Sequence, residues 1–230
     1  MLVSSRTFGY EYFELGHGTL YKRGYTWDIF IDYWRRAIDY LIRLCRPARV
    51  LDIGCAKGYL VYEFRRRGVE TFGVDISEYA LLQSPSSMKP FLCQADICET
   101  SLPFHSGVFD LITSLETIEH LNDPEKMIHE ISRLLRTDGV IFISTPSPGT
   151  DVAKADVTHV NVRSFKTWKR CFKKAHIRIK TLEPWVWEGE RGRLGNISEP
   201  LRSIIRRAVY PFLNVLIPRR RHLYLLGRKD

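Results

Sequence analysis

Apolar residues recur along the chain with two different periods, and the order of these periods predicts the fold class. Short apolar runs have the length and composition of strands, whereas other segments repeat apolar residues every three or four positions, as amphipathic helices do. The runs that predict strands lie near residues 49–53, 70–75, 90–96, 109–115, 139–145, 177–182 and 222–226. Because helical segments alternate with these runs, we predict an α/β fold with a doubly wound, mostly parallel sheet.

The ends of several helices are marked in the sequence. A helix is predicted over residues 27–45, where apolar side chains follow helical spacing until Pro47 stops the pattern. Asp123 followed by Pro124 is typical of a helix start, because an acidic cap precedes a proline that fits the first turn. Ser164 is predicted to cap a further helix. These signals place helices before the first strand, between the fourth and fifth strands, and before the sixth.

The segment from Arg49 to Gly58 joins the first buried strand to a tight turn that contains Gly54. Glycines let the backbone turn sharply and approach a ligand, so this segment predicts a nucleotide-binding loop. A phosphate loop requires Gly-Lys followed by Ser or Thr, but this chain has Lys57-Gly58-Tyr59. A dinucleotide fingerprint counted from Gly54 requires a small residue where the bulky Tyr59 stands, which argues against NAD.

A second acidic position supports a nucleoside ligand. Asp75 ends the predicted second strand, 23 residues after Asp52. A separation of about 20 residues is expected of a carboxylate that binds ribose hydroxyls. A carboxylate at the tip of a buried strand costs desolvation free energy and is retained only when something pairs with it. We therefore predict that Asp75 faces the ligand.

Five segments, in order along the chain, resemble the motifs of class I S-adenosylmethionine-dependent methyltransferases. They are Leu51–Gly58, Gly73–Ile76, Gln94–Ile97, Phe109–Glu116 and Leu134–Thr145. The resemblance covers roughly residues 48–183. It implies a seven-stranded Rossmann-like methyltransferase fold, in which the last two strands form an antiparallel edge hairpin, and S-adenosyl-L-methionine as the cofactor.

This resemblance also implies roles for individual residues. Asp75 would accept hydrogen bonds from both ribose hydroxyls, and Asp96 would meet the adenine amino group. The cofactor-binding set that the resemblance implies is Asp52, Gly54, Gly58, Asp75, Ile76, Asp96, Ile97 and Leu115. Asp52 is equally well explained as a residue that holds the amides of its own loop, and Asp96 as a helix cap or turn residue.

Glutamate and histidine residues gather after the predicted fourth and fifth strands. A helical turn would bring Glu116 close to Glu119 or His120, and His159 lies in a later loop that should border the acceptor. Together these four side chains are candidate ligands for Mg²⁺ or another divalent cation, which would lower the pKa of an acceptor hydroxyl. Without a metal, His159, His120 and Glu119 are the candidate catalytic residues, with an imidazole as general base. Both histidines are also compatible with purely structural hydrogen bonding.

The Glu-x-x-Glu-His pattern with a distant histidine resembles that of metal-dependent small-RNA terminal 2′-O-methyltransferases. Glu119-His120 alone also resembles the ubiquinone-pathway O-methyltransferases. The resemblance implies an S-adenosylmethionine-dependent methyltransferase that methylates oxygen on a small or anionic acceptor. Two alternatives stay open: an RNA-directed O-methyltransferase with a Glu/His-bound divalent metal, and a binding protein that keeps the fold without turnover.

Charge is distributed unevenly, which bears on the partner. Residues 163–230 hold 18 Lys and Arg against 5 Asp and Glu, whereas residues 1–162 hold 17 against 21. The net charge of +9 therefore comes from the last third of the chain. It favours an anionic acceptor or partner, whether a small molecule, a nucleic acid or a membrane surface. A solvated basic face that meets no polyanion explains the same charge.

One domain is expected. Residues 1–48 would form an N-terminal cap and helix, 49–183 the cofactor-binding core, 184–221 a basic amphipathic insertion, and 222–230 the final edge strand. The insertion would act as a lid, a membrane contact or a dimer contact, or pack on the core. The sequence shows no apolar run of membrane-spanning length and no signal-peptide pattern, so we expect a cytoplasmic protein, with peripheral contact to a membrane and oligomer formation left open.

Overall fold

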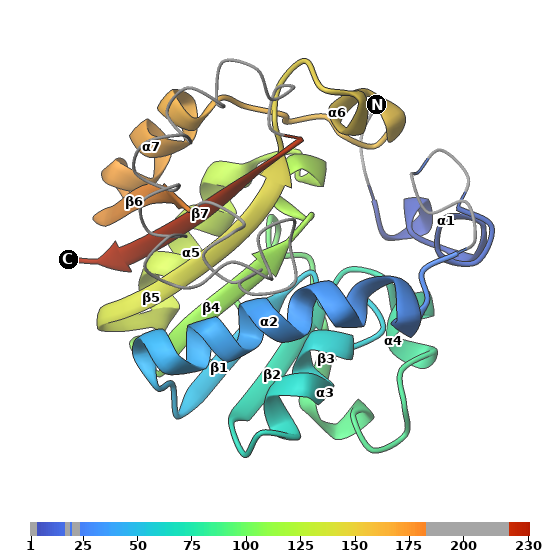
Figure 1. Ribbon diagram of the computed structural model, residues 1–230, viewed down its shortest axis with the longest axis horizontal. Helices are drawn as coiled ribbons and strands as arrows, with labels where there is room; N and C mark the ends of the chain where they lie inside the picture. Colours follow the sequence, from blue (N-terminus) through green and yellow to red (C-terminus); the bar gives the residue numbers. More distant parts are fainter. Residues whose placement is uncertain (1–3, 17–18, 20–23, 183–220) are drawn as a thin grey trace, which may run out of the picture.

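A seven-stranded sheet runs through the part of the chain that the computed structural model describes, which is residues 4–16, 19, 24–182 and 221–230 (Figure 1). In spatial order the strands are β3 (Leu92–Gln94), β2 (Glu70–Asp75), β1 (Arg49–Ile53), β4 (Phe109–Leu115), β5 (Leu135–Pro146), β7 (His222–Lys229) and β6 (Ile177–Leu182). The first five pair in parallel, and β7 runs antiparallel to both β5 and β6. The predicted doubly wound sheet with an antiparallel edge hairpin is therefore confirmed.

Seven α-helices in the described residues precede or follow the strands. They are α1 (Tyr10–Phe13), α2 (Trp27–Cys45), α3 (Tyr59–Arg65), α4 (Glu78–Leu82), α5 (Pro124–Leu134), α6 (Asp151–Ala155) and α7 (Phe165–Lys174), with short 3-10 turns η1 (Ser5–Thr7), η2 (Lys89–Phe91) and η3 (Ile118–His120). The predicted caps are confirmed, because the Asp123 carboxylate accepts a hydrogen bond from the amide of Lys126 and the Ser164 hydroxyl accepts one from the amide of Thr167.

Alternate residues of the central strands point to opposite faces of the sheet, and each face is covered by its own helices. On one face Val50 of β1 packs in a cluster with Ile38 of α2 and Phe64 of α3. On the other face Leu51 packs in a cluster with apolar side chains of α5 and α7, including the fully buried Trp168. Helices on both faces explain why the strands read as continuous apolar runs rather than as alternating ones.

Two strand boundaries differ from the sequence prediction. β3 has three residues instead of seven, because residues 89–91 form a 3-10 turn and Pro90 has no amide to donate to a ladder. β5 begins at Leu135, four residues before the predicted start at residue 139. The pairing is irregular there, because the register with β4 jumps from Leu135 to Val140, and Asp138 has a φ of 62°.

The carboxyl ends of β1, β2, β4 and β5 meet at one edge of the sheet, which is where ligands bind in open α/β folds. The loops after these strands, together with the N-terminal segment, therefore decide what can bind. The predicted insertion at 184–221 lies almost entirely outside the described residues and remains a prediction. Among the helices described, none combines the length and the apolar character that crossing a bilayer would require.

Candidate functional site

A cleft with a cavity volume of about 190 Å³ lies at the carboxyl edge of the sheet. Most of the residues predicted from the sequence line it, namely Asp52, Gly54, Asp75, Ile76, Asp96, Ile97, Leu115, Glu116, His120 and His159. Gly58 lies outside its wall and precedes the first turn of α3, and Glu119 is wholly buried behind the wall. We call Asp52, Asp75 and Asp96 the carboxylate end of the cleft, and Glu119, His120 and His159 the histidine end.

The glycine turn after β1 has the backbone that its sequence predicts. Gly54 and Gly58 have φ values of 77° and 73°, and even Ala56 between them is left-handed, with φ at 48°. A Cβ added to Gly54 would lie 2.1 Å from the Thr117 hydroxyl oxygen. Glycine is therefore required at position 54 both for its conformation and because the loop after β4 packs directly against the turn.

Asp75 is held by the backbone at the tip of β2. Its Oδ2 accepts a hydrogen bond from the amide of Ala56 at 2.7 Å, and its Oδ1 accepts one from the amide of Ser77 at 2.8 Å. Burial raises the pKa of Asp75, and the two amide hydrogen bonds act in the opposite direction. The carboxylate is thus fixed in orientation at the wall of the cleft, with lone pairs left for further donors.

The other two acids of the carboxylate end are also hydrogen-bonded. Asp52 Oδ1 accepts a hydrogen bond from the Thr113 hydroxyl at 2.7 Å, and burial raises the pKa of Asp52 to about 7. Asp96 Oδ1 accepts one from the amide of Cys98 at 2.8 Å, which is the turn role considered as an alternative for this residue. Because both side chains also line the cleft, local hydrogen bonding does not exclude contact with a ligand.

The N-terminal segment closes one side of the cleft. The Ser77 hydroxyl, beside Asp75, donates a 2.5 Å hydrogen bond to the carbonyl of Phe8. Lys57 Nζ lies 2.7 Å from Glu14 Oε1, and the lysine side chain is only 8% exposed. The rings of Phe8 and Tyr12 both pack edge-on against His120, so this segment contacts both ends of the cleft.

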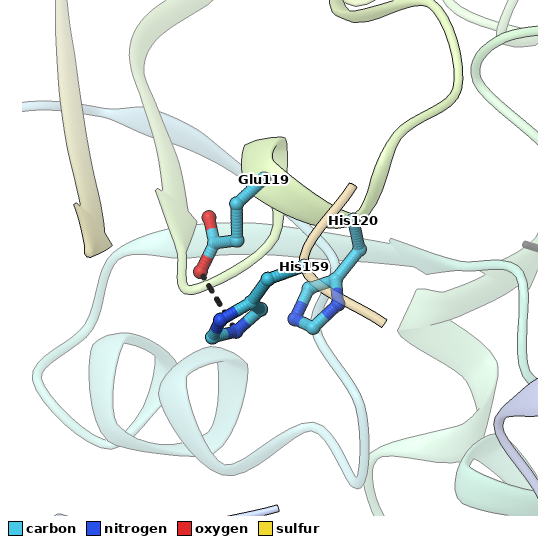
Figure 2. Close-up of side chains that lie close together, drawn as sticks. All are labelled: Glu119, His120 and His159. Atoms are coloured by element: carbon cyan, nitrogen blue, oxygen red, sulfur yellow. Dashed lines mark ion pairs between the residues drawn. The ribbon is translucent and has the colours of Figure 1, made fainter. Parts of the chain in front are cut away.

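The histidine end brings together three side chains from two separate loops (Figure 2). One ligand atom from each of Glu119, His120 and His159 lies within 4.8 Å of the other two. Neither carboxylate oxygen of Glu119 makes a hydrogen bond of normal geometry to a described residue, and the buried Thr145 hydroxyl nearby also lacks one. Burial, with the nearby Glu116, raises the pKa of Glu119 well above its usual value. A buried carboxylate without a partner is costly and therefore marks a place where a cation or proton belongs.

Hydrogen bonds fix which nitrogen of each imidazole carries the lone pair. His159 Nδ1 lies 3.3 Å from the carbonyl oxygen of Ala153, which can only accept, so Nδ1 carries the proton. His159 Nε2, which carries the lone pair in the neutral form of the ring, faces Glu119 Oε1 at 3.9 Å, the contact drawn in Figure 2. Two acceptor atoms facing each other across this gap are stabilised by a cation or a proton between them.

His120 is held in the same way by a side chain. Its Nδ1 lies 2.7 Å from the Thr158 hydroxyl oxygen. Burial, together with the neighbouring His159, lowers the pKa of His120 to about 4, so the ring is neutral at pH 7. The His120 ring is therefore a neutral ligand or base, and its direction, like that of the His159 ring, is set by its surroundings.

Glu116 does not join this cluster, although it was predicted as a metal ligand. It follows the end of β4 with a left-handed φ of 49°, which turns its carboxylate towards β5 and β7. There it accepts a 2.6 Å hydrogen bond from the Ser144 hydroxyl and lies 3.2 Å from His222 Nε2. His222 also lines the cleft and was missed from the sequence, where only its place at the start of the last strand gave a signal.

Comparison with protein families and curated proteins gives two findings. A family model described as "Methyltransferase domain" matches residues 27–191. The ubiquinone biosynthesis O-methyltransferase of Azoarcus sp. (strain BH72) is 34% identical over 114 residues, which are 47% of this chain and 49% of that protein. The chain thus spans about half the length of the curated relatives it matches.

Solved structures share the fold. A SAM-dependent methyltransferase from Archaeoglobus fulgidus superposes with a TM-score of 0.61 at 18% identity, covering 89% of this chain and 100% of that one. The phosphoethanolamine N-methyltransferase 2 of Haemonchus contortus, in complex with S-adenosyl-L-methionine, gives 0.58 at 19%, covering 86% and 53%. At these identities the likeness shows a shared fold and does not identify the atom that this chain methylates.

Proposed function

The chain belongs to the methyltransferase domain family, whose methyl donor is S-adenosylmethionine, and on that premise we propose that it methylates a hydroxyl oxygen of a small or anionic acceptor. The donor carries its own electrophile, so the protein has to bind it, aim a nucleophile at the methyl group and exclude water. A hydroxyl nucleophile must also lose its proton. The residues that meet this last requirement decide between oxygen and other acceptor atoms.

The observation that carries the proposal is the histidine end of the cleft. His120 and His159 line the cleft, and the carboxylate of Glu119 lies buried behind them, where no described residue gives its oxygens a hydrogen bond of normal geometry. Such a cluster attracts positive charge to a point beside the acceptor, which favours loss of the hydroxyl proton. The 34% identity to a ubiquinone biosynthesis O-methyltransferase, over about half of that protein, agrees with this assignment.

The carboxylate end fits the methyl donor. Asp75, fixed by two amides, presents its remaining lone pairs to the two ribose hydroxyls, and Asp96 and Ile97 provide an acceptor and an apolar surface for the adenine. The glycine turn supplies a wall without side chains on the side of the methionine portion. Because both ends share one cleft, a donor bound at the carboxylate end would leave the histidine end for the acceptor.

A divalent cation is the second part of the proposal, and the donor set fits it. Glu119, His120 and His159 would hold the ion, because carboxylate oxygen and imidazole nitrogen are common ligands of divalent metals and no described residue hydrogen-bonds the Glu119 oxygens with normal geometry. When bound, the ion lowers the pKa of the acceptor hydroxyl. Glu116 is already bonded to Ser144 and close to His222, so its place as a fourth ligand requires it to leave them.

The test is transfer of a labelled methyl group from S-adenosylmethionine to a panel of catechols, hydroxybenzoates, amines and RNA oligonucleotides. We expect product only with hydroxyl acceptors, and Glu119→Gln to lower turnover by about 100-fold or more while calorimetry shows unchanged donor binding. Transfer to amines alone, or full activity in Glu119→Gln, would refute the assignment. Wild-type activity that survives chelation and does not rise when Mg²⁺ or Mn²⁺ is added would assign the proton to an imidazole acting without a metal.

The anionic character of the acceptor is supported by the described surface. Helix α7 exposes basic side chains with no acidic residue between positions 157 and 182; they are Lys166, Lys169, Arg170, Lys173 and Lys174. None of these five lines the cleft, so they would attract an acceptor by long-range charge or hold a larger one outside it. A steep loss of acceptor affinity with added salt is expected for a polyanion such as RNA, and a flat salt dependence would limit the proposal to small acceptors.

A further inference from the structure

We infer that Thr158 and Asp156 are positioning residues, which fix the tautomer of His120 so that its Nε2 lone pair is available in the cleft. This inference deepens the proposed function and rests on it for its catalytic meaning. The hydrogen bonds on which it is built stand independently of any activity. The chain of contacts runs from a carboxylate through a hydroxyl to an imidazole.

The donor and acceptor roles in these hydrogen bonds follow from Asp156. Its Oδ1 accepts hydrogen bonds from the amide of Thr158 at 2.9 Å and from the hydroxyl of Thr158 at 2.5 Å. Its Oδ2 accepts a third from the hydroxyl of Tyr12 at 3.1 Å. Three donors converge on its two oxygens, and the residue is only 7% exposed, so Asp156 acts here as an acceptor.

The single hydroxyl proton of Thr158 is therefore used on Asp156. A hydroxyl has one proton and two lone pairs, so towards His120 the Thr158 oxygen can only accept. The nitrogen 2.7 Å away, His120 Nδ1, must be the donor and carry the ring proton. In the neutral ring the lone pair is then on Nε2, because the two nitrogens share one proton.

The two imidazoles of the histidine end are held by different kinds of acceptor. His159 Nδ1 faces a main-chain carbonyl, that of Ala153, which a substitution cannot remove. His120 depends on the Thr158 hydroxyl, and the Thr158 side chain is 3% exposed and does not line the cleft. Partners that orient a ligating or basic histidine typically change metal affinity or activity by about 10- to 100-fold when they are lost. Thr158 is thus the position where the tautomer can be tested.

The experiment compares Thr158→Val with Thr158→Ser, using ¹⁵N chemical shifts of the imidazole nitrogens and steady-state kinetics. In the wild type and in Thr158→Ser we expect a protonated Nδ1 and a bare Nε2 at His120. In Thr158→Val, Nδ1 has no acceptor, so we expect the proton to shift towards Nε2 and kcat to fall by about 10- to 100-fold with unchanged affinity for S-adenosylmethionine. Valine keeps the branched shape, and serine keeps the hydroxyl, so together they separate packing from hydrogen bonding.

Three outcomes would overturn the inference: a wild-type His120 protonated on Nε2, a Thr158→Val variant with the wild-type tautomer, or a Thr158→Ser variant as impaired as the valine one while its tautomer is normal. Failure of the proposed function looks different. If no hydroxyl acceptor is methylated, kcat cannot be compared between the variants. The ¹⁵N chemical shifts still report whether Thr158 sets the tautomer of His120.

Discussion

The two ends of the cleft differ in whether their buried carboxylates have hydrogen-bond partners. At the carboxylate end Asp52, Asp75 and Asp96 each accept a hydrogen bond within the protein. At the histidine end Glu119 is completely buried and neither of its oxygens has a hydrogen-bond partner in the described structure. The first end is therefore complete before any ligand arrives, whereas the second becomes complete only when a cation or proton is added. A site that binds a large donor gains affinity when its groups are already held in place. A site that removes a proton works better when a buried negative charge there still lacks a positive partner.

The sharpest way to test this contrast is to remove Asp75. Asp75→Ala should weaken S-adenosylmethionine binding by more than about 100-fold, because two hydrogen bonds between ribose hydroxyls and a charged group are lost, at about 1.5 to 3 kcal/mol each. Isothermal titration calorimetry measures the affinity. Asp110→Ala is the matched control, since Asp110 Oδ2 also accepts from two backbone amides, those of Ala48 and Arg49, but Asp110 does not line the cleft.

Both variants should lose stability towards unfolding, because each leaves two amides without an acceptor, and Asp110→Ala also removes the ion-pair partner of Arg136. Only Asp75→Ala should lose donor affinity. Equal affinities for the donor in the two variants would show that Asp75 shapes the loop and makes no contact with the ribose.

A smaller effect is expected from the pH dependence of stability. Burial raises the pKa of Asp52 to about 7 in the folded protein, against a value near 4 in the unfolded chain. Because the folded state binds this proton more tightly, ionisation destabilises it progressively as the pH rises from about 4 to 7. Asp52→Asn removes this penalty and keeps an acceptor for the Thr113 hydroxyl.

The free energy of unfolding of Asp52→Asn relative to the wild type should therefore rise by about 2 to 3 kcal/mol between pH 5 and pH 8. Urea denaturation at the two pH values measures it. A difference that is constant across this range would mean that Asp52 titrates normally and that the carboxylate end is better solvated than its burial indicates.

The smallest expected effect concerns the N-terminal segment that joins the two ends. Glu14→Gln weakens the contact with the nearly buried Lys57, so we expect S-adenosylmethionine to dissociate about 3- to 10-fold faster, as the loss of about 1 kcal/mol predicts. Stopped-flow fluorescence of the tryptophans, one of which lines the cleft, follows the release. Glu70→Gln breaks the exposed pair with Arg49 and should leave the rate unchanged. Equal rates for the two variants would show that the Glu14 contact does not hold the segment over the donor.

Features that depend on neighbouring residues in the chain were predictable. The buried strand before Gly54, the acid at the tip of the second strand and the caps at Asp123 and Ser164 are all local patterns, and the structure confirms each as a backbone feature. The pairing of Glu119 with His120 was predictable for the same reason. Local patterns therefore predict the order of strands and helices along the chain and the loops that border the cleft.

The composition of the histidine end was only partly predictable. Glu116 was expected beside Glu119, but its left-handed backbone turns it towards Ser144 and His222, which come from β5 and β7. Asp156 and Thr158 stand next to His159 in the sequence, yet they act on His120, 38 residues before Thr158. Nothing in local spacing reports such pairings, because they depend on which loops the sheet places at one edge.

The sequence by itself thus determined the alternation of strands and helices, the glycine turn and the acids at the strand ends, since hydrophobic period and backbone conformation are properties of short segments. Only the tertiary structure decided which carboxylates are satisfied and which is left without a partner. That decision requires the carboxyl ends of four strands and the N-terminal segment to meet around one cleft, where the low local dielectric makes every missing hydrogen bond costly.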